Sequence, residues 1–101
     1  MKLMDTQAII EKLGENEAAL KARGVSHAAL FGSRVRGESR PGSDIDIFVE
    51  IEPSFAMDVF QYVGVVHAIE DLFAERVDVS NRAAMKAHVR PSAERDAIYA
   101  F

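Results

Sequence analysis

Two aspartates, Asp44 and Asp46, stand two residues apart in the segment GSDIDIFVE at residues 42–50. The segment alternates as a strand does, which puts both carboxylates on one face and the apolar side chains on the other (Ile45, Ile47 and Val49). Strands disfavour aspartate, and neighbours on one strand face lie about 6–7 Å apart, so the two charges repel each other. The arrangement becomes favourable if this face binds divalent cations, and hard oxygen ligands suit Mg²⁺.

A third carboxylate would complete such a site, and Asp78 in the predicted strand RVDVS at residues 76–80 is the first candidate. Asp71 and Glu75 are rivals, but both fit the pattern of solvated helix residues. Two metal ions about 3.5–4 Å apart can hold the attacking and leaving oxygens of an in-line phosphoryl displacement. The predicted metal ligands and catalytic residues are therefore Asp44, Asp46 and Asp78, around two Mg²⁺ ions.

A predicted anion site precedes these acids in the chain. Gly32 allows the backbone to approach a ligand closely, and amides at the start of a short helix attract negative groups. The hydroxyl of Ser33 adds a donor, and nearby cations are available (Arg34, Arg36 and Arg40). A basic, glycine-containing turn beside an acidic strand suits a phosphate-rich ligand that carries metal ions.

The segments GSRVRG at residues 32–37 and SDID at residues 43–46 resemble the signature of the DNA-polymerase-β-type nucleotidyltransferases. The order of predicted elements is similar to that of the small, minimal members of this superfamily. The resemblance implies that a nucleoside triphosphate binds at Gly32, Ser33, Arg36 and Ser43, and that the three aspartates hold Mg²⁺. It also implies transfer of a nucleoside monophosphate to a hydroxyl with release of pyrophosphate. Val35 departs from the pattern, because alanine is commoner there.

The acceptor must come from outside a chain of 101 residues, which has no room for a second substrate-holding domain. The resemblance implies that the partner is a HEPN-domain ribonuclease toxin, that a tyrosine of this toxin is adenylylated with ATP, and that the chain acts as the antitoxin. Two alternatives remain open. The chain could neutralise a toxin by binding alone, or it could transfer the nucleotide to a small-molecule hydroxyl without a partner.

Composition predicts a single soluble domain over residues 1–101. The chain is 49% hydrophobic and 28% charged, contains no cysteine, and has no apolar run that approaches the length of a membrane span. We therefore expect a cytoplasmic protein that does not enter a membrane. The net charge of −4 lacks the broad positive surface of a general nucleic-acid binder, so no direct nucleic-acid binding is expected.

The predicted fold is α/β (α+β), a two-layer nucleotidyltransferase fold with helices on one face of a small, mixed, three-stranded sheet. Helical spacing covers residues 5–23, with Asp5 or Thr6 as the cap, and strands are predicted at 25–31, 44–50 and 76–80. Residues 56–74 fit either a strand or a helix, and the predicted order uses the helix. Residues 83–89 are a weak helix or a loop, and Ser92 is the predicted cap of a last helix through Tyr99.

The histidines and the surplus apolar residues form two further groups. The histidines stand on different predicted elements, which favours ordinary positions over a zinc site (His27, His67 and His88). The 56–74 helix is apolar around most of its surface, which predicts contact with a partner or with a second copy in a homodimer. Aromatic residues outside the predicted strands are expected to be tucked into the core or to extend this docking surface (Tyr62, Tyr99 and Phe101).

Overall fold

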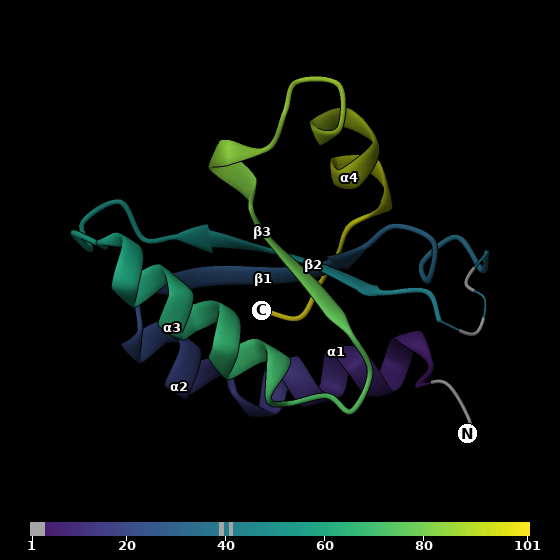
Figure 1. The fold of residues 1–101 in the computed structure, drawn as a ribbon, viewed down its shortest axis with the longest axis horizontal. Helices are drawn as coiled ribbons and strands as arrows, with labels where there is room; N and C mark the ends of the chain where they lie inside the picture. Colours follow the sequence, from purple (N-terminus) through teal and green to yellow (C-terminus); the bar gives the residue numbers. More distant parts are fainter. Residues whose placement is uncertain (1–3, 39, 41) are drawn as a thin grey trace.

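A computed structural model describes residues 4–38, 40 and 42–101 as helices packed on a four-stranded sheet (Figure 1). The elements in chain order are α1 (Thr6–Glu15), α2 (Glu17–Ala22), β1 (Val25–Phe31), β2 (Ile45–Ile51), α3 (Val59–Glu70), β3 (Val77–Asn81), the short 3₁₀ helix η1 (Arg82–Ala84), α4 (Arg90–Asp96) and β4 (Ile98–Tyr99). The mixed α+β class is as predicted. No helix within the described ranges combines the length and the apolar character needed to cross a membrane.

The predicted helix over residues 5–23 is divided into two. Asp5 caps α1 as expected, because its side chain accepts a hydrogen bond from the amide of Ala8 at 2.8 Å. Asn16 then ends α1 and begins α2, and its side-chain amide donates to the carbonyl of Lys12 at 2.8 Å. An asparagine competes for backbone hydrogen bonds in this way, so it interrupts a helix that the apolar spacing alone would continue.

The sheet has the order β3-β2-β1-β4, so the prediction of three strands was wrong by one. The sheet is mixed as expected, because β2 pairs antiparallel with β1 and parallel with β3. The fourth strand, β4, is only two residues long and pairs antiparallel with β1. The sequence predicted helix as far as Tyr99, but the amide of Ala100 donates to the carbonyl of Ala28, and this edge pairing extends the chain instead.

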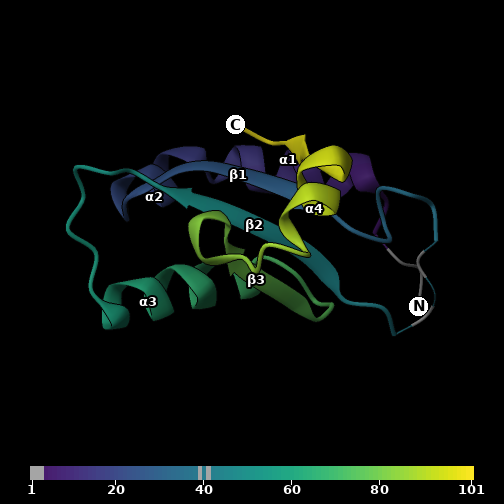
Figure 2. The same ribbon diagram turned by 90° about the horizontal axis from the view of Figure 1, so that it is seen from above.

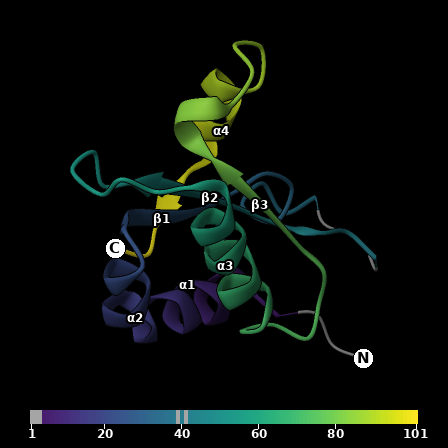
Figure 3. The same ribbon diagram turned by 60° about the vertical axis from the view of Figure 1, so that its left-hand side comes forward.

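Helices α1, α2 and α3 cover one face of the sheet, while η1 and α4 lie on the opposite face (Figures 1 and 3). Seen from above, α4 lies toward the end of the sheet where β1 ends and β2 begins (Figure 2). The core between the sheet and the first three helices is apolar; its most enclosed members include Ile9, Leu13, Leu30, Ile45, Ile47, Val49, Val65 and Ile69. The predicted apolar face of β2 therefore points into this core, and the face with the aspartate does not.

Helix α3 settles the ambiguity of residues 56–74. A capping box begins it: the carboxylate of Asp58 accepts from the amide of Gln61 at 2.7 Å, and the Gln61 side chain accepts from the Asp58 amide at 2.9 Å. Val65 and Ile69 of this helix are buried, whereas Val59 and Val63 are exposed. Phe60 is 83% exposed, so surplus apolar surface is indeed present.

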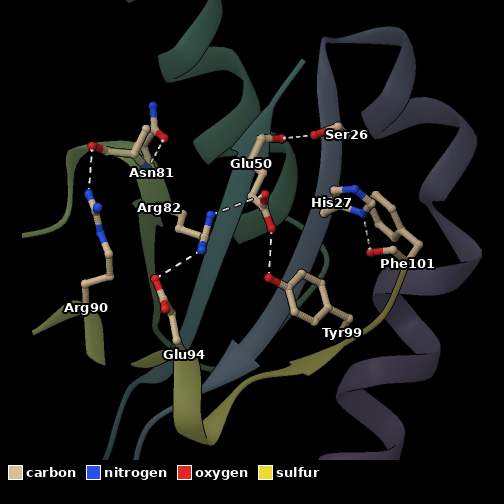
Figure 4. A network of polar contacts seen from close by, with 10 residues as sticks. Ser26, His27, Glu50, Asn81, Arg82, Arg90, Glu94, Tyr99 and Phe101 are labelled. Atoms are coloured by element: carbon tan, nitrogen blue, oxygen red, sulfur yellow. Dashed lines mark hydrogen bonds and ion pairs between the residues drawn. The ribbon is translucent and has the colours of Figure 1, made fainter. Parts of the chain in front are cut away.

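The last segment is held on the sheet by a polar network around Glu50 (Figure 4). The hydroxyl of Tyr99 donates to Glu50 at 2.8 Å, and Arg82 bridges from Glu50, at 3.6 Å, to Glu94 on α4, at 3.1 Å. The prediction that Ser92 caps the last helix was wrong. Helix α4 begins at Arg90, and the Ser92 hydroxyl instead donates to a backbone carbonyl one turn back.

Candidate active site

The predicted anion site lies where β1 ends. Gly32 has a φ of 84°, which only glycine adopts easily, and it starts a helical turn whose later amides donate back to the carbonyls of Gly32, Ser33 and Arg34. Within the described residues, the amides of Ser33 and Arg34 at the start of this turn donate no hydrogen bond. Free amides in one turn are what an anion site requires, and binding of a phosphate here stays a prediction.

Asp46 and Asp78 are brought side by side by the pairing of β2 with β3. The two residues are partners in the parallel register, so their side chains share one face of the sheet. Asp46 is also the register partner of Phe31, which places it beside the turn that follows β1. A Cβ atom at Gly32 would lie 3.1 Å from Cγ of Asp46 and closer still to its carboxylate oxygen, so a larger residue would displace this acid.

The electrostatics of Asp46 show that the charged groups of the site act on one another. Its partial burial raises the pKa of the Asp46 carboxyl, and the negative charges of Asp78 and Asp44 raise this pKa further. The positive charges of Arg36 and Arg34 act in the opposite direction. Within the described chain the Asp46 side chain makes no hydrogen bond or ion pair, so this half-buried carboxylate has no protein partner for its charge.

Asp44 lies just before β2, which begins at Ile45, and its carboxylate is 3.7 Å from the guanidinium of Arg76. Asp44 and Asp78 line a cleft of about 310 Å³ together with Arg76, two glutamates and a valine (Glu70, Glu75 and Val77). No three acidic or histidine side chains in the described ranges are arranged to hold one ion as a group. The residue types still suit Mg²⁺, because Asp46 and Asp78 share one face of the sheet and the negative charge of Asp44 also acts on Asp46.

Arg36 is held at the edge of the site by two carboxylates. Its guanidinium donates to Glu38 at 3.1 Å and to Asp96, at the end of α4, at 2.5 Å. The hydrogen bonds to Glu38 and Asp96 raise the pKa of Arg36, so it stays a cation. The role of Asp96 gave no signal in the sequence, because it depends on how the last segment folds back over the sheet.

Ser43 and Arg34, two further residues of the predicted phosphate site, both make contacts within the protein. The Ser43 hydroxyl accepts from the amide of Arg40 at 3.0 Å in the loop before Asp44. Arg34 is not the free phosphate-binding cation that the sequence suggested, because its residue is only 6% exposed and its guanidinium pairs with Glu75. The reading of Glu75 as a solvated helix residue was also wrong: it follows α3, and the hydrogen bond from Arg34 lowers its pKa.

Residues 9–100 match the nucleotidyltransferase domain family. The chain belongs to this family. The nucleotidyltransferase fold and activity predicted from the signature at residues 32–46 are therefore confirmed, and the chain is an enzyme of the transferase class.

Individual relatives agree with this assignment. The protein adenylyltransferase MntA of Thermococcus cleftensis is 29% identical over 102 residues, which cover 98% of this chain and 99% of the relative. A solved structure described as a minimal nucleotidyltransferase superposes with a TM-score of 0.68 at 27% identity, over 97% of this chain and 98% of the other. A chain of the tri-AMPylated HEPN toxin and MNT antitoxin complex of Shewanella oneidensis shares the fold, with a TM-score of 0.60 at 17% identity over 90% of this chain and 71% of the other.

Proposed function

We propose that this nucleotidyltransferase is a Mg²⁺-dependent protein adenylyltransferase that acts as an antitoxin. It transfers AMP from ATP to a tyrosine hydroxyl of a HEPN-type ribonuclease partner. The observation that carries the proposal is the register alignment of Asp46 with Asp78, beside the glycine turn at Gly32. The name of the full-length Thermococcus relative, and the AMPylated toxin in the Shewanella complex, support AMP as the transferred group and a HEPN protein as the acceptor.

Each predicted residue has a role in this proposal. The free amides of the turn at Ser33 and the nearby Arg36 hold the β- and γ-phosphates, with Ser43 on the adjoining loop. Asp44, Asp46 and Asp78 would hold the Mg²⁺ ions. When bound, Mg²⁺ neutralises charge on the phosphates and makes the acceptor hydroxyl more acidic.

The transfer is an in-line displacement at the α-phosphorus of ATP. The tyrosine oxygen forms a bond to this phosphorus, and the bond from phosphorus to the oxygen bridging to the β-phosphate breaks. Pyrophosphate leaves with the electron pair of that bond. Asp78 is the most exposed of the three acids, and it accepts the proton that the hydroxyl loses.

The test is incubation of the chain with ATP labelled at the α-phosphate and with Mg²⁺, in the presence and absence of the product of the neighbouring gene. Label on a partner tyrosine is the expected result. Tight association without label would instead establish a binding-only antitoxin, and label on a small hydroxyl compound would establish a stand-alone transferase.

The Asp46→Asn variant should lower label transfer by more than about a hundredfold, because it removes a direct ligand of the metal rather than a supporting contact. Glu52→Gln, which removes the same charge from an exposed loop residue, is the control and should transfer label normally. Unchanged turnover in Asp46→Asn would remove the assignment of the site.

Four further expectations stay predictions: a single domain over residues 1–101, a cytoplasmic location, a homodimer and the lack of nucleic-acid binding.

A further inference from the structure

Arg34 is the only charged residue that is buried within the described part of the chain. Its side chain and that of Glu75 are 3% and 14% exposed, and the two form an ion pair. One guanidinium nitrogen of Arg34 also donates to the carbonyl of Met4 at 2.9 Å, and the other to the carbonyl of Ser43 at 3.2 Å. The third guanidinium nitrogen, Nε, is buried without a partner. Loss of one member of an enclosed ion pair leaves the other charge uncompensated, so the pair constrains the separation of the segments that it joins.

The joined segments are those that lead into the acids of the site. Ser43 immediately precedes Asp44, and Glu75 stands two residues before the start of β3, which carries Asp78. The backbone bonds agree with this arrangement, because the amide of Ile45 donates to the carbonyl of Arg76 at 2.9 Å, where the two strands begin to pair. The Glu75 carboxylate is itself held by the amide of Met4 at 2.9 Å, so it cannot turn freely toward the cleft.

We propose that Arg34 and Glu75 form a positioning pair that sets the separation of the two acid-bearing segments, and hence the affinity of the site for divalent cations. This inference rests on the proposed function, since it concerns the same metal ligands. The planar guanidinium is suited to this role, because its donors point in fixed directions and bridge two backbone segments and a carboxylate at once. In this proposal the side chains of Arg34 and Glu75 act by placing the acids and do not themselves hold the nucleotide or the acceptor.

The test measures binding of Mn²⁺, as a probe for Mg²⁺, in the presence of an ATP analogue with a non-hydrolysable α,β-bridge. Glu75→Gln keeps the size of the side chain but loses the ion pair, and Arg34→Lys keeps the charge but loses the planar fork. Both variants should bind Mn²⁺ about ten- to a hundredfold more weakly than the wild-type chain, as is typical when groups that orient metal ligands are changed. Glu17→Gln, which breaks an exposed ion pair with Lys21 on α2, is the matched control and should bind Mn²⁺ as the wild type does.

Label transfer and melting temperature separate positioning from a general loss of structure. Transfer by the folded variants should recover at high Mg²⁺ concentration, which a loss of folded protein would not allow. A folded Arg34→Lys or Glu75→Gln chain with the wild-type Mn²⁺ midpoint would overturn the positioning role and leave the proposed function intact. A wild-type chain that binds no Mn²⁺ with the analogue would overturn the proposed function, and this inference with it.

Discussion

Asp46 is destabilising in the ligand-free protein, and this follows from its surroundings. It is partly buried, it faces Asp78 across the strand pair, and the described residues offer its carboxylate no hydrogen bond. Burial and the neighbouring negative charges raise its pKa, so the ionised form is disfavoured in the folded chain. The acid that we propose as a metal ligand is therefore expected to lower the stability of the free protein.

We predict that Asp46→Asn raises the melting temperature in metal-free buffer at neutral pH, although it should strongly lower transfer. An increase of about 4 °C is expected, which corresponds to about 1 kcal/mol in a domain of this size. Glu52→Gln removes one negative charge from an exposed position and controls for net charge. Thermal melts followed by circular dichroism with a chelator present would check this, and a variant less stable than wild type would contradict the account of Asp46.

The difference in stability between Asp46→Asn and the wild-type chain should depend on pH. Because the pKa of Asp46 is raised in the folded state, the folded chain binds its proton more tightly than the unfolded chain does. Proton binding by Asp46 therefore favours the folded state. This contribution to stability is complete at pH values below the pKa of Asp46 in the unfolded chain, and it is lost as the pH rises through the raised pKa of Asp46 in the folded chain. The stability gain of Asp46→Asn should therefore be small in acid and should grow to a plateau toward neutral pH.

At the scale of elements, helix α3 has one face in the core and a second apolar face in solvent. Ile69 is fully buried among the core residues under the sheet, whereas Phe60 on the first turn is 83% exposed. The helix begins with its capping box and does not need the exposed apolar residues for its own formation.

We predict that Ile69→Ala lowers the free energy of unfolding by about 2–5 kcal/mol, as large-to-small changes in a packed core do. Phe60→Ala should change the same quantity by less than about 0.5 kcal/mol, because the side chain loses few contacts. Urea titrations of both variants and the wild type would check the pair. A large loss in Phe60→Ala would mean that the helix is rotated from the orientation described above.

The elements that the sequence predicted well are those with local signals. The alternation of β2 and the acid in RVDVS are visible in the chain, and together with the GS turn they are enough to single out Asp44, Asp46, Asp78 and Gly32. The orientation of α3 was not predictable, because valines and aromatics surround the helix and only the sheet decides which face is covered. Likewise β4 is two residues long and exists only because β1 offers an unpaired edge.

At the scale of the whole molecule, the site depends on parts that are far apart in sequence. The turn after β1, the start of β2, the start of β3 and the end of α4 all meet at one end of the sheet. The polar network around Glu50 holds the last segment in place (Figure 4). Asp96 on that segment then holds Arg36. Contacts of this kind between distant segments could not be read from the sequence.

A ligand that binds only the assembled site should therefore stabilise the entire fold. We predict that Mg²⁺ with a non-hydrolysable ATP analogue raises the melting temperature of the wild-type chain. At a hundredfold excess over Kd the expected stabilisation is about 2.7 kcal/mol. Asp46→Asn should show little of this shift, and addition of a chelator should reverse it in the wild type. Equal shifts in the two proteins would place the nucleotide elsewhere.

The parallel register of Asp46 and Asp78 has a consequence for insertions and deletions. The crossover through α3 can change in length without moving either acid, provided that β3 returns in the same alignment. Inside β3 the rule differs, because successive side chains point to opposite faces. One residue gained or lost between Val77 and Asp78 would turn the Asp78 carboxylate toward the core. Changes in chain length are therefore limited by the alternation of side chains in β3 and not by the length of the crossover.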